Sequence, residues 1–325
     1  RPVTNGELNG LMHVWRVSYH EQADFTQSIK DALSVVLTSP QFLFIVENSC
    51  GPQAEDLDEF ELASKLSYFL WNAPPDQRLL DLANAGRLRQ TLNDEVDRMI
   101  GDPRFSRFAE QFASEWLSLD KFDVVSVDRE AFPELTREVK AQLRQEPTRF
   151  LEHLFRGNLS ARNLIQSEFV VANEVVASYY GLAEEADQGF EFIPVALQRD
   201  NPRRPSGGLL TQAAILAGLS NGRESNPIKR GAWLARKIIA EPPADPPPNV
   251  PMLEEDHTSE LTLRQQLEIH RNQKGCAKCH EGIDPWGIPF ESFDAAGLFK
   301  PVPDAETTSQ LPDSDELAGG IVSGI

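Results

Sequence analysis

Apolar residues recur every three to four positions along most of the chain, the spacing of one face of an α-helix. In residues 25–39 the stripe is clear, with apolar side chains at positions 29, 32, 33, 36 and 37. Thr4 and Glu7 form a capping box that predicts the start of a helix over residues 4–20. The same periodicity predicts further helices over residues 58–71, 76–83, 88–100, 103–117, 209–219, 228–240 and 262–272.

Three stretches depart from this simple pattern. Residues 134–155 have the pattern of one long helix, and Pro147 within it predicts a kink because proline lacks the amide hydrogen. Apolar residues alternate in residues 189–197, which predicts a strand and one side of a small hairpin. The apolar run at residues 42–46 predicts a buried turn of helix or a strand. The pattern as a whole predicts a mainly α fold, with a bundle-like body of several helices and a small β element.

A proline-rich stretch near the C-terminal end helps to divide the chain. Residues 241–251 hold six prolines in eleven positions, which predicts an extended polyproline connector. Because the stretch lacks glycine and serine, we expect a fixed strap across the surface. We expect four parts: an N-terminal helical pair (1–50), a central helical domain (51–200), a domain with the proline strap and the cysteine motif (201–300), and the start of a truncated C-terminal domain (301–325).

Composition narrows the classes of function. The 50 acidic residues outnumber the 31 basic ones and give a net charge of −19, which argues against binding nucleic acid or anionic membrane surfaces. The longest mostly apolar run, residues 209–219, is far shorter than the roughly 20 residues of a membrane span. The sequence opens on Arg1-Pro2 without the apolar region of a signal peptide.

Two of the three cysteines lie in the stretch Cys276-Ala277-Lys278-Cys279-His280. A C-x-x-C-H sequence is typical of a covalent attachment site for c-type haem. The two thiols bond to one porphyrin, and the histidine that follows is carried to the iron as its proximal ligand. We therefore expect one covalently bound haem c near the C-terminal end, attached at Cys276 and Cys279 and ligated by His280.

Other readings of the cysteines are less consistent with the sequence. A zinc site would need Cys50 together with the motif, and the adjacency of Cys279 and His280 makes tetrahedral ligation by both awkward. A thioredoxin-like dithiol follows a strand, whereas the residues before Cys276 have a helical pattern. A plain disulfide leaves the histidine unexplained. Because haem c is attached outside the cytoplasm, we expect a mature or fragmentary chain whose export signal lies upstream.

The surroundings of the iron are only partly indicated by the sequence. Met252, His257 and His270 lie near the motif and are the candidates for the distal ligand. An open distal position is the other option and favours catalysis over electron transfer. Trp286 and Phe290 follow the motif and are the expected walls of the porphyrin site.

Three carboxylates, Asp284, Glu291 and Asp294, also follow the motif. They are candidates to accept a hydrogen bond from the His280 ring, which would orient it. The same three carboxylates could instead bind a calcium ion, or only cap the loop.

Longer motifs carry a resemblance to a known family. After the cysteine motif come Ile283-Asp284-Pro285-x-Gly287 and Phe290-Glu291-x-Phe293-Asp294-x-x-Gly297. With residues 1–4, 39–43 and 62–71, and with Arg230-Gly231-x-Trp233 before the strap, the chain resembles the planctomycete-type multidomain c-type cytochromes. Their C-terminal half is a series of domains of unknown function. The resemblance implies an exported haem protein and assigns no reaction.

Together these features predict an extracytoplasmic c-type cytochrome, periplasmic or extracellular, that passes single electrons. Its expected partner is a redox protein or a larger cytochrome assembly. The alternative is a haem-dependent oxidoreductase of peroxidase or dehydrogenase type with an open distal site, so whether the chain is an enzyme is left open. A third hypothesis is a binding or scaffold module in which haem is structural.

Overall fold

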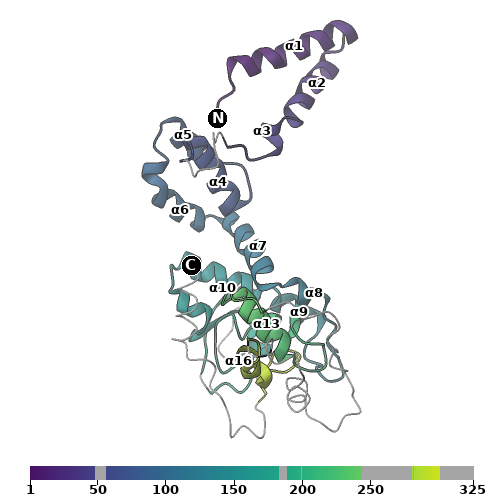
Figure 1. Cartoon of the computed structure of the whole chain (residues 1–325), viewed down its shortest axis with the longest axis vertical. Coiled ribbons are helices and arrows are strands. Elements are labelled where there is room, and N and C mark those ends of the chain that lie inside the picture. The colour runs from purple at the N-terminus through teal and green to yellow at the C-terminus, as the bar shows by residue number, and fades with distance from the viewer. Residues whose placement is uncertain (48–55, 183–188, 199, 244–279, 281, 301–325) are drawn as a thin grey trace. The chain divides into compact units, whose positions relative to one another are not determined.

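The computed structural model describes residues 1–47, 56–182, 189–198, 200–243, 280 and 282–300 (Figure 1). As predicted, the fold is mainly α with one small two-stranded sheet. The chain divides into two compact units, Arg1–Phe108 and Ala109–Ile325. Among the described helices, none has the length and apolar character needed to cross a membrane. The predicted domain boundaries at residues 50, 200 and 300 stay predictions.

Most helices of the N-terminal unit begin where the sequence predicts them, but the helix predicted from residue 88 begins at Leu92, after a 3₁₀ turn. Helix α1 has the predicted capping box of Thr4 with Glu7, and α4 has a second one, formed by Asp58 with Glu61. Such boxes satisfy amide groups that a helix start leaves without partners. The elements of this unit are α1 (Asn5–Gln22), α2 (Phe25–Leu37), α3 (Pro40–Leu43), α4 (Glu59–Trp71), α5 (Gln77–Asn84) and α6 (Leu92–Gly101), with short 3₁₀ turns at Arg89–Thr91 and Pro103–Phe105.

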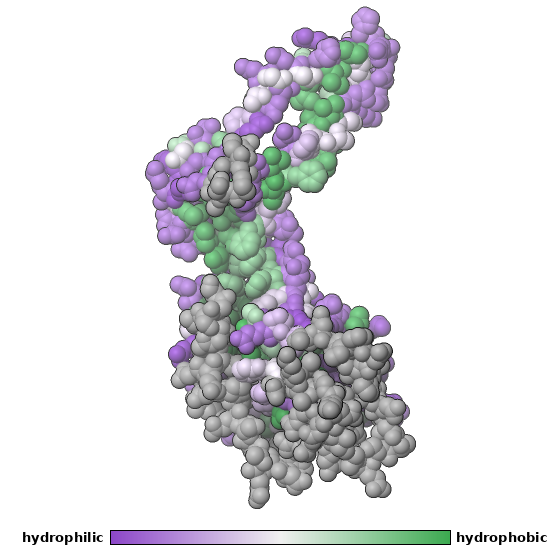
Figure 2. All heavy atoms as spheres, in the orientation of Figure 1, coloured by the Kyte–Doolittle hydropathy of each residue, from purple (hydrophilic) through white to green (hydrophobic). Residues whose placement is uncertain are grey.

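The apolar stripe of α2 lies largely at the surface. Ile29, Leu33 and Leu37 are all exposed, whereas Ser18 of α1 and Ser28 of α2 are buried. Figure 2 shows such apolar residues in green on the surface of the N-terminal helices. The run at residues 42–46 begins within α3 as a turn of helix, but the prediction that it is buried is wrong, since all five side chains are exposed. Helices α1 and α2 pack against each other along one face. The apolar residues of α2 outside that contact are exposed to solvent.

The C-terminal unit corrects the prediction of one long helix over residues 134–155. Two helices occupy this stretch, and the chain turns between them at Arg144 and Gln145. Pro147 lies in the first turn of the second helix, where a missing amide hydrogen costs nothing. The helices of this unit within the described residues are α7 (Ser106–Leu117), α8 (Asp120–Val124), α9 (Arg137–Leu143), α10 (Glu146–Arg156), α11 (Glu174–Tyr179), α12 (Ala213–Gly218), α13 (Pro227–Lys237) and α16 (Asp284–Gly287), with 3₁₀ turns at Ala161–Leu164 and Ile288–Ser292.

The small sheet confirms the predicted strand and corrects its connection. Strand β2 (Ile193–Ala196) lies within the predicted stretch and pairs antiparallel with β1 (Phe169–Ala172). The expected hairpin is wrong, because the connection between the strands contains α11. The predicted helix at residues 262–272 and the proline strap beyond residue 243 lie outside the described residues.

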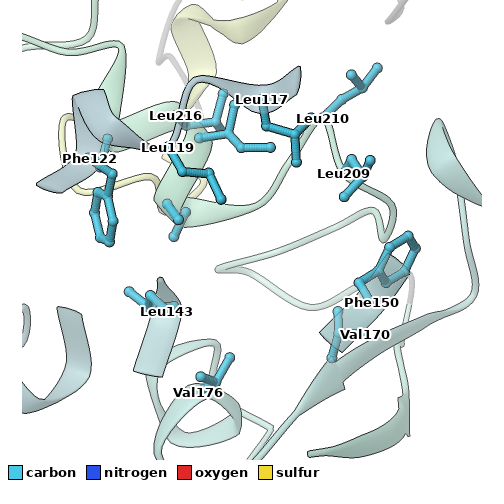
Figure 3. Packing of buried hydrophobic residues seen from close by; sticks show 14 of the residues in the cluster. Leu117, Leu119, Phe122, Leu143, Phe150, Val170, Val176, Leu209, Leu210 and Leu216 are labelled. Atoms are coloured by element: carbon cyan, nitrogen blue, oxygen red, sulfur yellow. The ribbon is translucent and has the colours of Figure 1, made fainter. Parts of the chain in front are cut away.

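One apolar core runs through the C-terminal unit. It includes side chains from α7 to α13 together with Phe290, Phe293 and Ala296. Figure 3 shows Leu117, Leu119 and Leu216 gathered in this core from α7, the turn after it and α12. The segments predicted as a central domain and as a haem domain therefore contribute to the same core.

A buried polar network crosses this core. The Arg204 guanidinium donates to Glu146 Oε1 at 2.6 Å, and the Tyr180 hydroxyl donates to Glu146 Oε2 at 2.6 Å. The Tyr180 oxygen in turn accepts the Ala213 N–H at 3.0 Å. Burial raises the pKa of Glu146, and the charge of Arg204 beside it opposes that shift. Charges this deep are tolerated only when they are paired and hydrogen-bonded.

Replacing Arg204 by Met should destabilise the chain by about 3–5 kcal/mol, because it leaves the buried Glu146 carboxylate without its cation. The matched control is Arg203→Met, next in sequence, whose ion pair with Glu134 is 38% and 55% exposed. The control should cost at most about 1 kcal/mol. Urea unfolding followed by circular dichroism measures both, and equal losses in the two variants would contradict the importance of the buried network.

Candidate functional site

Only part of the predicted site falls within the described residues. His280, Trp286 and Phe290 are described. The remaining predicted site residues lie outside them, namely Cys276, Cys279 and the three distal candidates Met252, His257 and His270. The described part of the site consists of His280 and the segment at residues 282–300.

The His280 ring is held by a carboxylate one helical turn further on. His280 Nδ1 lies 2.8 Å from Asp284 Oδ1, and the two side chains are only 7% and 13% exposed. The Ile283 N–H bonds to the His280 carbonyl, which gives the chain the turn that brings residues 280 and 284 to one side. A hydrogen bond to the carboxylate requires the hydrogen on Nδ1, and in that tautomer Nε2 has the lone pair that a metal binds.

Two of the three carboxylates after the motif, Asp284 and Asp294, have separate surroundings. Asp284 contacts the imidazole, whereas Asp294 Oδ1 accepts the backbone N–H groups of Ala296 and Leu298, both at 2.9 Å. Burial raises the pKa of Asp294. Within the part of the chain that the structure describes, no group of three or more His, Cys, Asp or Glu side chains is arranged to hold a metal. The two described roles are thus ring orientation by Asp284 and loop capping by Asp294.

The two aromatic residues predicted as porphyrin walls both pack against the core. Phe290 is 2% exposed, and its ring centroid lies 6.3 Å from that of Phe293. Trp286 is partly buried against the same cluster. Their contact with a porphyrin stays a prediction.

Helix α16, which carries Asp284, lies directly against α13 (Figure 1). Two glycines make this close approach possible. A Cβ on Gly231 of α13 would collide with the Ile283 carbonyl oxygen and lie 2.9 Å from the Gly287 nitrogen. A Cβ on Gly287 would collide with the Pro227 carbonyl oxygen and lie 3.2 Å from the Gly231 Cα. Backbone therefore packs on backbone on either side of Asp284.

Arg230, next to Gly231 on α13, fixes the segment beyond α16. Its guanidinium is buried and donates four hydrogen bonds, all to backbone carbonyls. The acceptors are Phe290 and Phe293 (both 2.6 Å), Asp294 (2.7 Å) and Leu216 of α12 (3.0 Å). Burial lowers the pKa of Arg230 to about 9, and the nearby Asp294 charge opposes that shift.

Trp233 is the third named residue of the Arg230-Gly231-x-Trp233 motif on α13. Its indole N–H donates to the Leu117 carbonyl at 3.0 Å, which ties α13 to the end of α7. The motif Arg230-Gly231-x-Trp233 thus has a structural role that the sequence pattern alone did not assign. One signal was present: Arg230, Trp233 and Leu234 share one helix face, so a cation stands on an apolar stripe.

Gly231→Ala should destabilise the C-terminal unit by about 1–3 kcal/mol, because the added methyl group overpacks the contact between α13 and α16. The control is the same change at Gly10, inside α1, where a Cβ meets nothing within 4 Å. Gly10→Ala should be neutral or gain up to about 1 kcal/mol. Urea unfolding of the two variants provides the comparison, and an unaffected Gly231→Ala would show that the helices can separate freely.

Three family models match successive segments of the chain. Residues 1–47 match PSD5, protein of unknown function (DUF1595); residues 57–182 match PSD4, protein of unknown function (DUF1592); and residues 206–302 match PSCyt3, protein of unknown function (DUF1588). No curated protein and no solved structure matches the chain. The chain is therefore made of segments that match, in order, three domain families of the planctomycete-type multidomain cytochrome c-like proteins.

Proposed function

We propose that this chain is an extracytoplasmic c-type cytochrome that binds one haem c through Cys276, Cys279 and His280 and passes single electrons. The observation that carries the proposal is the partly buried hydrogen bond between His280 Nδ1 and Asp284 Oδ1. A histidine that ligates a metal nearly always donates its other ring N–H to such an acceptor. Here that arrangement occurs directly after two cysteines at haem-attachment spacing.

The residues present fit a haem c group. Asp284 selects the ring form in which Nε2 has the lone pair that iron needs. Cys276 and Cys279 supply the two thiols, and His280 follows the second one directly. When bound, the haem iron supplies a one-electron couple, whose potential depends on its ligands and their hydrogen bonds.

The protein around His280 is suited to an electron carrier. An electron carrier works best when its ligands keep their positions in both oxidation states, which requires a rigid support. The backbone contact between Gly231 and Gly287 and the carbonyl contacts of Arg230 provide such support on the side of α13. The three candidates for the distal ligand, Met252, His257 and His270, lie outside the described part.

The proposed setting is a larger exported assembly. Haem c is attached outside the cytoplasm, which supports a periplasmic or extracellular location. A net charge of −19 suits a basic redox partner, because complementary charge speeds encounter between proteins. The match to a family named PSCyt3 supports a cytochrome-like role in a multidomain protein.

The full chain, matured in a host that attaches haem c, should give the pyridine haemochrome spectrum of one covalent haem per chain. Cys276→Ser and Cys279→Ser should each lose or weaken covalent attachment, since each removes one thioether. Cys50→Ser is the matched control and should keep full haem content. A matured wild-type chain without a haemochrome would overturn the proposed function.

The oxidised protein should have a low-spin spectrum that excess cyanide does not change, because an electron carrier keeps both axial positions filled. Single changes Met252→Ala, His257→Ala and His270→Ala then identify the distal ligand. The responsible variant should become high-spin and bind cyanide, while the other two serve as controls. A wild-type protein that is high-spin and binds cyanide would favour the haem-dependent oxidoreductase instead.

A further inference from the structure

We infer that Asp284 is a positioning residue that makes His280 a more electron-donating ligand and thereby lowers the reduction potential of the haem. This inference rests on the proposed function. It adds that Asp284, a residue outside the attachment motif, sets part of the reduction potential of the haem iron.

The contact between the two side chains has the geometry of a charge-assisted hydrogen bond. His280 Nδ1 and Asp284 Oδ1 are 2.8 Å apart, within the short range seen for N–H donors to ionised oxygens. Both side chains are nearly buried, at 7% and 13% exposure. Away from water the attraction between the carboxylate and the ring is strengthened, since less solvent screens it.

The direction of the effect follows from charge. A carboxylate that accepts the Nδ1 hydrogen increases the basicity of the imidazole, so Nε2 donates more electron density to a bound metal. The negative charge close to the ring also favours the iron state with the larger positive charge. Both effects stabilise ferric over ferrous iron, and the potential falls.

The packing of α16 keeps the carboxylate at the ring. Ile283 precedes Asp284 and Gly287 ends the same short helix, and both lie against the backbone of Gly231. Elsewhere in the chain, Asp24, Asp58 and Asp76 direct their oxygens to N–H groups at the starts of their own helices. The helix that Asp284 begins has no side-chain cap at Ile283, and Asp284 directs Oδ1 to the imidazole.

The test is the midpoint potential of the matured full-length protein and of Asp284→Asn, which keeps the size of the side chain and removes its charge. The ferrous-to-ferric ratio at a fixed potential should rise at least tenfold, a positive shift of about 59 mV for one electron. Glu224→Gln is the charge-matched control at an exposed carboxylate of the same unit. The control should shift the potential little, because solvent screens exposed charges.

Each outcome decides between the alternatives. Normal haem content with an unchanged potential in Asp284→Asn overturns this inference and leaves the proposed function standing. An equal shift in Glu224→Gln overturns it too, because net charge alone would then explain the change. Absence of covalent haem in the wild type overturns the proposed function itself.

A second variant and a measurement on the wild type cover the case in which Asp284→Asn does not fold. Asp284→Glu keeps the carboxylate, and its potential should lie near that of the wild type. In the reduced, ¹⁵N-histidine-labelled wild type, the Nδ1–H of the haem-bound histidine should exchange slowly with solvent. Exchange as fast as in an exposed imidazole would overturn the inference.

Discussion

The Arg230 guanidinium binds four carbonyl oxygens from two parts of the chain, α12 and residues 290–294. A buried cation is costly, and the lowered pKa of Arg230 reflects that cost. The carbonyls would otherwise be buried near the end of a short helix and in an irregular turn, where backbone supplies few donors. One side chain therefore replaces many of the hydrogen bonds that a regular element would provide. The segment after His280 depends on this interaction for its position.

Local signals predicted the helices well because caps and periodicity are set by neighbouring residues. Thr4 with Glu7 began α1 as predicted, and the periodic stripe marked α2. Prediction from the sequence failed where the structure of a segment depends on residues far away along the chain. Strand β1 is four residues long and gains its hydrogen bonds from β2, beyond α11. Periodicity shows which face of α2 is apolar, but it does not show what covers that face. In the structure the apolar stripe of α2 is largely exposed.

The candidate site also has some features that the sequence predicts and others that only the folded structure shows. The cysteine motif and the option of a carboxylate partner for His280 are visible in the sequence, because Asp284 lies four residues away on the same turn. The function of Gly231 is not visible there, since a glycine inside a helix only lowers helix propensity. Glycine is needed at position 231 because its backbone contacts that of Ile283 and Gly287, more than fifty positions further along the chain. Only the folded structure reveals this contact.

The network of Glu146, Tyr180 and Arg204 crosses a boundary between matched families. Glu146 and Tyr180 belong to the segment matching PSD4, whereas Ala213, whose N–H bonds to the Tyr180 oxygen, belongs to the segment matching PSCyt3. The apolar core crosses the same boundary. A gene rearrangement that moved the PSCyt3 segment alone into another protein would expose part of the core and break the buried hydrogen bond from the Ala213 N–H to the Tyr180 oxygen. The two segments are thus expected to be inherited as a pair, as one evolutionary unit with two family names.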